Sequence, residues 1–170
     1  CYSSFELSQG SGFNGFGLLL DSMGNDMYIC GNIPGATTPQ QPGIGHNYSQ
    51  GAAYGNDSFG TLIDLLGNDV YVANLSAQGL GFRKGVGALF DISGDDLYVG
   101  IQYVQGAASH EGQGLFYDLS GSDVHYVTSS QGLGSAKNSR NDIFPAIAIF
   151  VDEKGDDIYN FEGDSCGVGI

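Results

Sequence analysis

The chain has 170 residues, of which 29 are glycine and 4 are proline, and its 19 acidic residues against 5 Lys plus Arg give a net charge of −14. This charge has the wrong sign for gripping a phosphate backbone, so nucleic acid is excluded as a partner. No apolar run approaches the roughly 20 residues that cross a bilayer, so no membrane span is expected in this stretch. The glycine content favours many tight turns.

One pattern, Asp-x-x-Gly-x-Asp, recurs along the chain. Its copies are Asp21/Gly24/Asp26, Asp64/Gly67/Asp69, Asp91/Gly94/Asp96, Asp118/Gly121/Asp123 and Asp152/Gly155/Asp157. The best-spaced copies place Asp64, Asp91 and Asp118 27 residues apart. Self-similarity at a fixed period of this length is typical of a repeat architecture, in which each repeat forms one coil.

Each repeat offers three short strand-like segments, separated by glycines. In chain order within a repeat, one segment follows a Gln-Gly pair, one precedes the Asp motif (18–20, 62–63, 89–90), and one follows the motif. Short runs of aliphatic and aromatic residues bounded by Gly, Asn, Asp and Ser predict strands, and no segment has the period of an amphipathic helix. We therefore predict an all-β fold, a parallel β-helix or β-solenoid with about three strands per coil and five to six coils.

Stacking the coils about 4.8 Å apart places equivalent residues in columns. An aromatic column is predicted two residues after each motif, at Tyr28, Tyr71, Tyr98, His125 and Tyr159. A glutamine column is predicted at Gln9, Gln50, Gln78, Gln105 and Gln131, each of which is followed by glycine. We expect its amides to bond up the stack as a structural ladder, with contact to a ligand as the alternative.

The whole chain, 1–170, is interpreted as a single solenoid domain. Its coils are expected near 2–28, 28–71, 71–98, 98–126, 126–159 and 159–170, with insert loops at about 30–46 and 135–146. Such inserts map to surface loops and often to the binding face, although neutral loops are the alternative. Tyr2 and Cys166 occupy repeat positions in incomplete coils, so we expect the chain to be a part of a longer array.

The acidic turns provide the candidate metal ligands. These are Asp21, Asp26, Asp64, Asp69, Asp91, Asp95, Asp96, Asp118, Asp123, Asp152, Asp156 and Asp157. Carboxylates stacked about 5 Å apart repel one another by tenths of a kcal/mol to a few kcal/mol per pair. Ca²⁺ suits such turns because it takes oxygen ligands in flexible arrangements, whereas His46, His110 and His125 lack the spacing of zinc ligands. The open alternative is that the aspartates cap backbone amides without a metal.

The stretches 64–72 and 91–99 resemble the RTX nonapeptide, Gly-Gly-x-Gly-x-Asp-x-Φ-x. The resemblance covers the Gly-x-Asp of each motif copy and the apolar strand that follows. It implies a calcium-binding turn and a parallel β-roll. This chain departs from the RTX pattern in having one copy per 27 residues and an aspartate in place of the leading glycines, so ligand positions do not transfer directly.

The repetition leaves no unique constellation of residues, so no catalytic residue and no enzymatic activity is predicted. We expect a noncatalytic, secreted or cell-surface scaffold, stabilised by calcium and used in adhesion or filament-forming assembly. The apolar runs 18–20, 115–117 and 148–151 lack strict alternation, which favours self-association or a lateral protein partner over one sheet. The alternatives are a β-helix polysaccharide lyase or hydrolase, with Arg83 and Lys84 as its adjacent cations, and a carbohydrate-binding module in which tyrosine and phenylalanine contact a glycan.

Overall fold

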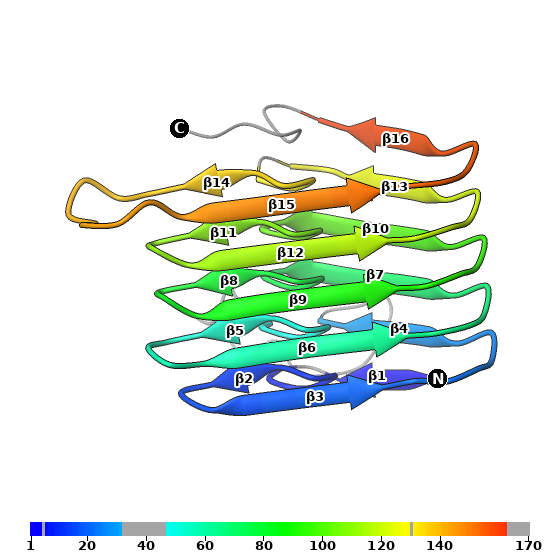
Figure 1. Ribbon diagram of the computed structural model, residues 1–170, viewed down its shortest axis with the longest axis horizontal. Coiled ribbons are helices and arrows are strands. Elements are labelled where there is room, and N and C mark those ends of the chain that lie inside the picture. The colour runs from blue at the N-terminus through cyan, green and yellow to red at the C-terminus, as the bar shows by residue number, and fades with distance from the viewer. Residues whose placement is uncertain (5, 32–46, 130, 163–170) are drawn as a thin grey trace.

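The structure is a computed structural model that describes residues 1–4, 6–31, 47–129 and 131–162. The chain winds as a solenoid whose coils stack into three parallel sheets (Figure 1). Sheet A contains β1 (Tyr2–Ser4), β4 (Met27–Cys30), β7 (Val70–Leu75), β10 (Leu97–Gln102), β13 (Val124–Val127) and β16 (Ile158–Phe161). Sheet B contains β2 (Gly12–Phe13), β5 (Ala53–Tyr54), β8 (Gly81–Phe82), β11 (Ala108–Ser109) and β14 (Ala136–Lys137). Sheet C contains β3 (Phe16–Leu20), β6 (Phe59–Asp64), β9 (Val86–Asp91), β12 (Gln113–Asp118) and β15 (Ile147–Asp152).

This arrangement confirms the predicted all-β solenoid with three strands per coil. Each complete coil contributes one strand to each sheet, and each strand pairs in parallel with its equivalents in the neighbouring coils. Over the ranges that the structure describes there is no helix, and therefore none with the length and apolar character needed to cross a membrane.

The aromatic column has the predicted register. Tyr28 pairs with Tyr71, Tyr71 with Tyr98, and Tyr98 with His125, all in sheet A. The rings of Tyr71 and Tyr98 are stacked with centroids 4.8 Å apart. Strand spacing in a sheet is about 4.8 Å, so the stacking distance follows directly from the coil repeat.

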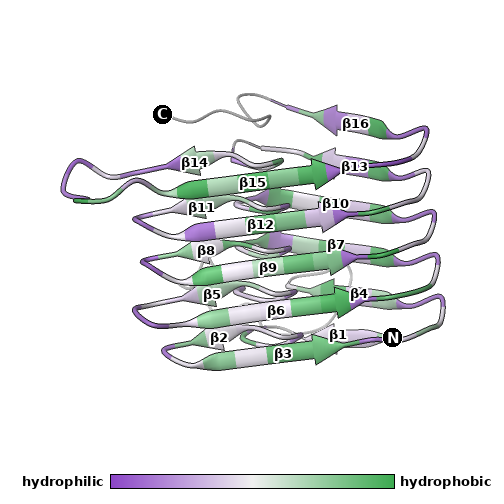
Figure 2. Ribbon diagram, viewed as in Figure 1, coloured by the Kyte–Doolittle hydropathy of each residue, from purple (hydrophilic) through white to green (hydrophobic). Residues whose placement is uncertain are grey.

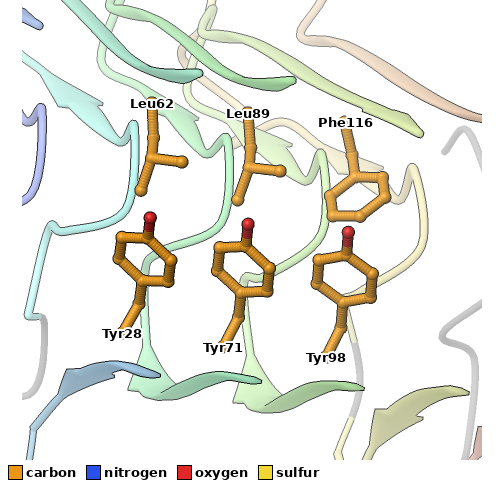
Figure 3. Close-up of a cluster of buried hydrophobic side chains, with 6 residues drawn as sticks. All are labelled: Tyr28, Leu62, Tyr71, Leu89, Tyr98 and Phe116. Carbon is orange, nitrogen blue, oxygen red and sulfur yellow. The ribbon is translucent and has the colours of Figure 1, made fainter. Parts of the chain in front are cut away.

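A second column faces the tyrosines across the interior. Leu62, Leu89 and Phe116 from sheet C point toward the tyrosine rings of sheet A (Figure 3). These side chains are fully buried, as are Tyr71 and Tyr98. The core is therefore a layered stack in which each coil repeats the packing of the previous coil.

The glutamine column differs from the expected ladder in its partners. The Gln50 amide donates to the backbone carbonyls of Tyr28 and Val72, at 2.9 and 3.0 Å. Gln78 donates in the same way to Tyr71 and Val99. Each amide thus links two neighbouring strands of sheet A through the backbone and does not bond to the next glutamine.

Gln131 was predicted to continue this column, but Leu133 takes its place. The Gly134 amide donates to the Gln105 carbonyl at 3.0 Å, the bond that Gly106 makes to Gln78 one coil earlier at 2.8 Å. Leu133 follows His125 by eight residues, whereas Gln105 follows Tyr98 by seven. The extra residue moves the Gln-Gly pair away from the corner, which the sequence pattern alone did not reveal.

The two predicted inserts have different outcomes. Most of the first, residues 32–46, lies outside the described residues, as does Cys166. The second is visible as the loop between β14 and β15, which projects beyond the neighbouring turns (Figure 1).

The outer face of sheet C is apolar. In β3 the outward side chains of Phe16, Leu18 and Leu20 are 72%, 54% and 60% exposed. Hydrophobic colouring is strong in β3, β9 and β15, whereas β12 begins with the hydrophilic Gln113 (Figure 2). In β12 the inward Phe116 alternates with the more exposed Leu115 and Tyr117, so the strand does alternate, with apolar residues on both faces.

Candidate metal centre

The Asp motif forms the turn between sheet C and sheet A. Its first aspartate ends the sheet C strand, as Asp91 ends β9, and its second immediately precedes the sheet A strand, as Asp96 precedes β10. Its glycine is required by close contact, because a Cβ on Gly94 would lie 1.6 Å from the carbonyl oxygen of Gly67. The same clash would arise at Gly121 against Gly94, at 1.7 Å. Stacking alone therefore explains this glycine.

The second aspartate of each motif hydrogen-bonds the backbone of the preceding coil. The Asp96 Oδ1 atom accepts the Asp69 amide at 2.6 Å, and Asp123 Oδ1 accepts the Asp96 amide at 2.7 Å. Asp157 continues the ladder by accepting the Asp123 amide at 3.0 Å, and Asp69 accepts the amide of Asp26. One oxygen of each of these carboxylates is therefore used to join coils.

The first aspartate of each motif contacts the tyrosine hydroxyls. Tyr71 Oη lies 3.0 Å from Asp64 Oδ2 and 2.7 Å from Asp91 Oδ2. Tyr98 Oη lies 2.9 Å from Asp91 Oδ2 and 2.8 Å from Asp118 Oδ2. A hydroxyl carries one proton, so each tyrosine can donate to only one of its two carboxylates. Tyrosine thus relieves only part of the repulsion between the stacked carboxylates.

These contacts gather the aspartates into three clusters that could hold a metal ion. Each combines both aspartates of one motif with the first aspartate of the next, with ligand oxygens within 4.8 Å of one another. The clusters are Asp64/Asp69/Asp91, Asp91/Asp96/Asp118 and Asp118/Asp123/Asp152. Exposure is 3% or less for every member except Asp152, which is half-buried as a residue but has a side chain that is only 2% exposed.

Several carboxylate oxygens in the clusters have no hydrogen-bond partner. These buried atoms are Asp69 Oδ2, Asp91 Oδ1, Asp123 Oδ2 and Asp152 Oδ1. An unpaired charged oxygen away from water is costly, so such atoms call for a cation or a proton.

The pKa values of several clustered carboxyls are raised, because their charged forms are buried close to one another. Burial, reinforced by neighbouring carboxylates, raises the pKa of Asp91 to about 6 and of Asp118 to about 8. It raises the pKa of Asp69 and Asp123 to about 7, and that of Asp96 to about 9. Desolvation disfavours the charged form, and a bound cation reverses that preference.

The predicted ligands therefore separate into two groups. Seven of them, the members of the three clusters, are brought together. The remaining five candidates are Asp21, Asp26, Asp95, Asp156 and Asp157, which belong to no cluster within the described residues. Asp95 and Asp156 are exposed, and Asp95 Oδ1 accepts the Ser122 amide at 2.9 Å as a cap between coils.

The tyrosine hydroxyls were not predicted as part of this site, because the aromatic column was assigned to packing alone. The signal was present in the spacing, since Tyr28, Tyr71, Tyr98 and Tyr159 each follow the first aspartate of their motif by seven residues. A fixed offset between a hydroxyl and a carboxylate on adjoining strands allows a repeated hydrogen bond. Comparison with protein-family models, curated proteins and solved structures gives no match to this chain.

Proposed function

We propose that the protein is a noncatalytic repeat scaffold stabilised by Ca²⁺ bound in the three aspartate clusters. The observation that carries this proposal is the burial of seven carboxylates in contact with one another, with oxygens left unpaired. The clusters are closed from solvent, which suits a structural ion better than a site that must admit a substrate.

The ligand set favours Ca²⁺ over other cations. Every clustered side chain is a carboxylate, and hard oxygen ligands suit Ca²⁺ and Mg²⁺, whereas zinc prefers nitrogen and sulfur. Adjacent clusters share Asp91 and Asp118, so carboxylates bridge neighbouring ions. Ca²⁺ accepts such irregular, shared coordination more readily than Mg²⁺, which demands near-octahedral geometry. The resemblance of the motif to RTX turns supports the same cation.

A secreted or cell-surface location fits this chemistry. Extracellular calcium modules work with dissociation constants of roughly 10⁻⁴–10⁻³ M, because the ion is plentiful there. The scaffold would then be stable outside the cell and lose its compensating charge wherever calcium is scarce.

The assembly role rests on the outer face of sheet C, for which we propose a second copy of this chain as the occupant. The outward residues of this sheet include no charged side chain, although the chain carries a net charge of −14. Two such faces can therefore approach each other without repulsion between like charges. Sedimentation velocity should show a dimer that Leu18→Ser weakens, whereas Leu66→Ser, at an equally exposed position in a turn, leaves it unchanged. A monomer at all concentrations would remove the assembly role.

The metal proposal is tested by thermal unfolding in EDTA and in millimolar CaCl₂. Calcium should raise the midpoint, because a ligand that binds only the folded state stabilises it. Asp96→Asn should lose most of this gain while remaining at least as stable in EDTA, because asparagine resembles the neutral acid. Asp95→Asn removes the same charge from the exposed neighbouring residue and should keep the full calcium effect. An unchanged wild-type midpoint would instead assign the turns to tyrosine hydrogen bonding and proton uptake.

A further inference from the structure

A cleft of about 380 Å³ lies on the side of the solenoid away from the Asp turns, where sheet B turns into sheet C. Its walls come from the β8–β9 turn (Arg83 and Lys84), the β11–β12 turn (His110 and Glu111) and the loop 138–146 between β14 and β15. The volume falls within the range of small-molecule sites. This cleft shares no residue with the aspartate clusters.

The two turns hold their side chains in an uncommon backbone conformation. Arg83, Lys84, His110 and Glu111 have φ values of 49°, 67°, 52° and 62°, where glycine or asparagine is favoured. Hydrogen bonds between the turns fix this geometry, because the Arg83 amide donates to the Ser109 carbonyl and the Lys84 amide to the His110 carbonyl, both at 3.2 Å. Four adjacent charged or titratable side chains thus line one cleft.

Arg83 is positioned but lacks an anionic partner. Its Nη1 donates to the Tyr54 hydroxyl at 2.6 Å, and its guanidinium lies 5.4 Å from the Tyr54 ring centroid and 5.7 Å from that of Phe82. Among the described residues no carboxylate forms an ion pair with it. In a chain of charge −14, a fixed and unpaired guanidinium in a cleft favours binding of an anion.

The other charged residues that line the cleft, Lys84, Glu111 and Asp142, are already engaged. Asp142 Oδ2 accepts the Ser139 amide at 2.6 Å. Lys84 Nζ lies 3.2 Å from Glu111 Oε2, and Glu111 Oε1 accepts the Ile143 amide at 2.5 Å. This backbone hydrogen bond, together with Lys84, lowers the pKa of Glu111. Glu111 therefore ties the loop 138–146 to the turn and offsets the charge of Lys84, so Arg83 is the cation of the cleft that has no carboxylate partner among the described residues.

His110, Asn56 and Asn141 add polar groups to the lining of the cleft. The Ser109 hydroxyl donates to the Lys137 carbonyl at 2.8 Å and lies 2.8 Å from His110 Nδ1. Because its single proton is used at the carbonyl, Ser109 accepts from His110 Nδ1, and in the neutral ring His110 Nε2 is then an acceptor. Asn56 and Asn141 add amides that both donate and accept. Such groups match a ligand rich in hydroxyls.

A second hollow of about 410 Å³ adjoins the cleft across the Lys84–Glu111 pair. It is lined by Gln113, Phe144, Pro145 and Ile147 together with that pair. Phe144 is 64% exposed and Ile147 48% exposed, so this hollow offers an open apolar surface beside the polar one. A ligand that spans both hollows needs a negatively charged group at one end and a flatter, less polar group at the other.

We propose that these two hollows bind an acidic oligosaccharide. The carboxylate of a uronic acid unit pairs with Arg83, and the hydroxyls of that unit hydrogen-bond to His110, Asn56 and Asn141. The adjoining sugar ring lies against Phe144. This site is independent of the calcium clusters and adds glycan recognition to the proposed scaffold.

Isothermal titration calorimetry with the intact chain at fixed calcium tests the proposal, using digalacturonic acid, galacturonic acid, galactose and inorganic phosphate as probes. Digalacturonic acid should bind, and galactose should not. Arg83→Asn should weaken binding about tenfold or more, through the loss of a charge-assisted pair, because asparagine keeps the turn conformation. Arg140→Asn, which removes an exposed cation of the loop 138–146, should leave the affinity for digalacturonic acid unchanged.

Phe144→Ala should weaken binding of the disaccharide but not of the monosaccharide. Binding of phosphate as tight as that of digalacturonic acid would reduce the site to a simple anion site and overturn the glycan assignment. Unchanged binding in Arg83→Asn, with an unchanged unfolding midpoint, would overturn it as well. Asp96→Asn should retain saccharide binding, so the failure of the calcium proposal and the failure of this one are distinguishable.

Discussion

The regular coils from β7 to β12 and the irregular coil from β13 to β15 use different residues for the same positions. In the regular coils Tyr71 and Tyr98 stack and contact two carboxylates each, whereas the next ring is His125, which lies 3.2 Å from Asp152. The corner residue is Gln105 in a regular coil and Leu133 in the irregular one. His125 still stacks on Tyr98 at 4.8 Å. Ring stacking and backbone pairing therefore persist where the polar partners change.

This difference separates the repeat positions that close backbone packing requires from those that serve as hydrogen-bonding partners. The glycine column runs unbroken through both regions, since a Cβ on Gly155 would lie 1.6 Å from the Gly121 carbonyl oxygen, as close as a Cβ on Gly94 would lie to that of Gly67. The tyrosine column is interrupted by His125, and the glutamine column by Leu133. Close backbone approach tolerates no substitute, while a hydrogen-bonding side chain can be replaced by another packing solution.

The largest expected effect comes from breaking the element that both regions share. Gly94→Ala places a Cβ 1.6 Å from the Gly67 carbonyl oxygen, so the coils must separate locally. We expect a loss of about 3 kcal/mol or more in the free energy of unfolding, measured by urea denaturation. Gly15→Ala is the control, because its nearest neighbour atom would be 3.7 Å away, and it should change stability little. Equal effects would show that close approach does not limit the stack.

The second prediction uses pH to separate the two regions. In EDTA, carboxyls whose folded pKa is raised, to about 8 for Asp118 and about 9 for Asp96, favour folding below the unfolded pKa of about 3.9. This contribution is lost progressively as pH rises from about 4, the unfolded pKa, to about 9, the folded pKa of Asp96, so the unfolding midpoint should fall over that range. Saturating calcium should remove the fall.

The pKa of Asp152, in the irregular coil, is shifted in the opposite direction. Burial alone would raise its pKa, but hydrogen bonds from His125 and Tyr159 lower it below the ordinary value. Its contribution is therefore present above the unfolded pKa and lost as pH falls through the folded one. NMR titration of the aspartate carboxyls would read both regions in one experiment, and a normal pKa for Asp96 in EDTA would contradict this prediction.

A smaller effect is expected when a regular corner is given the irregular residue. Gln78→Leu removes the amide that donates to the Tyr71 and Val99 carbonyls at 3.2 and 3.1 Å. The buried carbonyls lose a partner, and we expect about 1–2 kcal/mol of destabilisation by chemical denaturation. Gln113→Leu, the same change at an exposed position, should have almost no effect. If the two variants unfold alike, the glutamine column is dispensable.

The smallest effect is expected from making the irregular coil regular. His125→Tyr would place a hydroxyl between Asp118 and Asp152 and remove the buried His125 Nδ1, which has no hydrogen-bond partner. The new ring should fit, since Tyr98 already packs edge-on against Phe116. We expect a gain of about 1 kcal/mol from differential scanning calorimetry, and a similar loss from the reverse change Tyr98→His. A loss in both variants would show that the irregular coil is packed for histidine.

Much of the fold could be predicted because the repeat constrains it. The 27-residue period and the glycine-bounded apolar runs determine a three-strand coil, and the register of the tyrosines follows from their constant place after the motif. The exception was Gln131, where one additional residue shifts the corner to Leu133. Pattern matching counts residues along the chain, whereas backbone pairing decides which residue reaches the corner.

The candidate site was predicted only in part. The sequence identified the acidic turns, but it could not separate the buried Asp96 from the exposed Asp95 beside it. The seven-residue offset that brings the Tyr98 hydroxyl to the carboxylates was present in the sequence but was assigned to packing. The 27-residue separation of Arg83 and His110 equals one coil, but it did not reveal that the two side chains line one cleft.

By itself, the sequence determined the repeat, the parallel stacking and the columns, because identical neighbours above and below leave only one register that keeps every side chain on its own face. The tertiary structure decided burial, and with it the chemistry. Closing three sheets around a shared interior turns the carboxylate of Asp96 away from water and leaves that of Asp95 exposed. Burial, not the motif, is what raises the pKa of Asp96, so that a proton or a bound cation is needed to neutralise its charge.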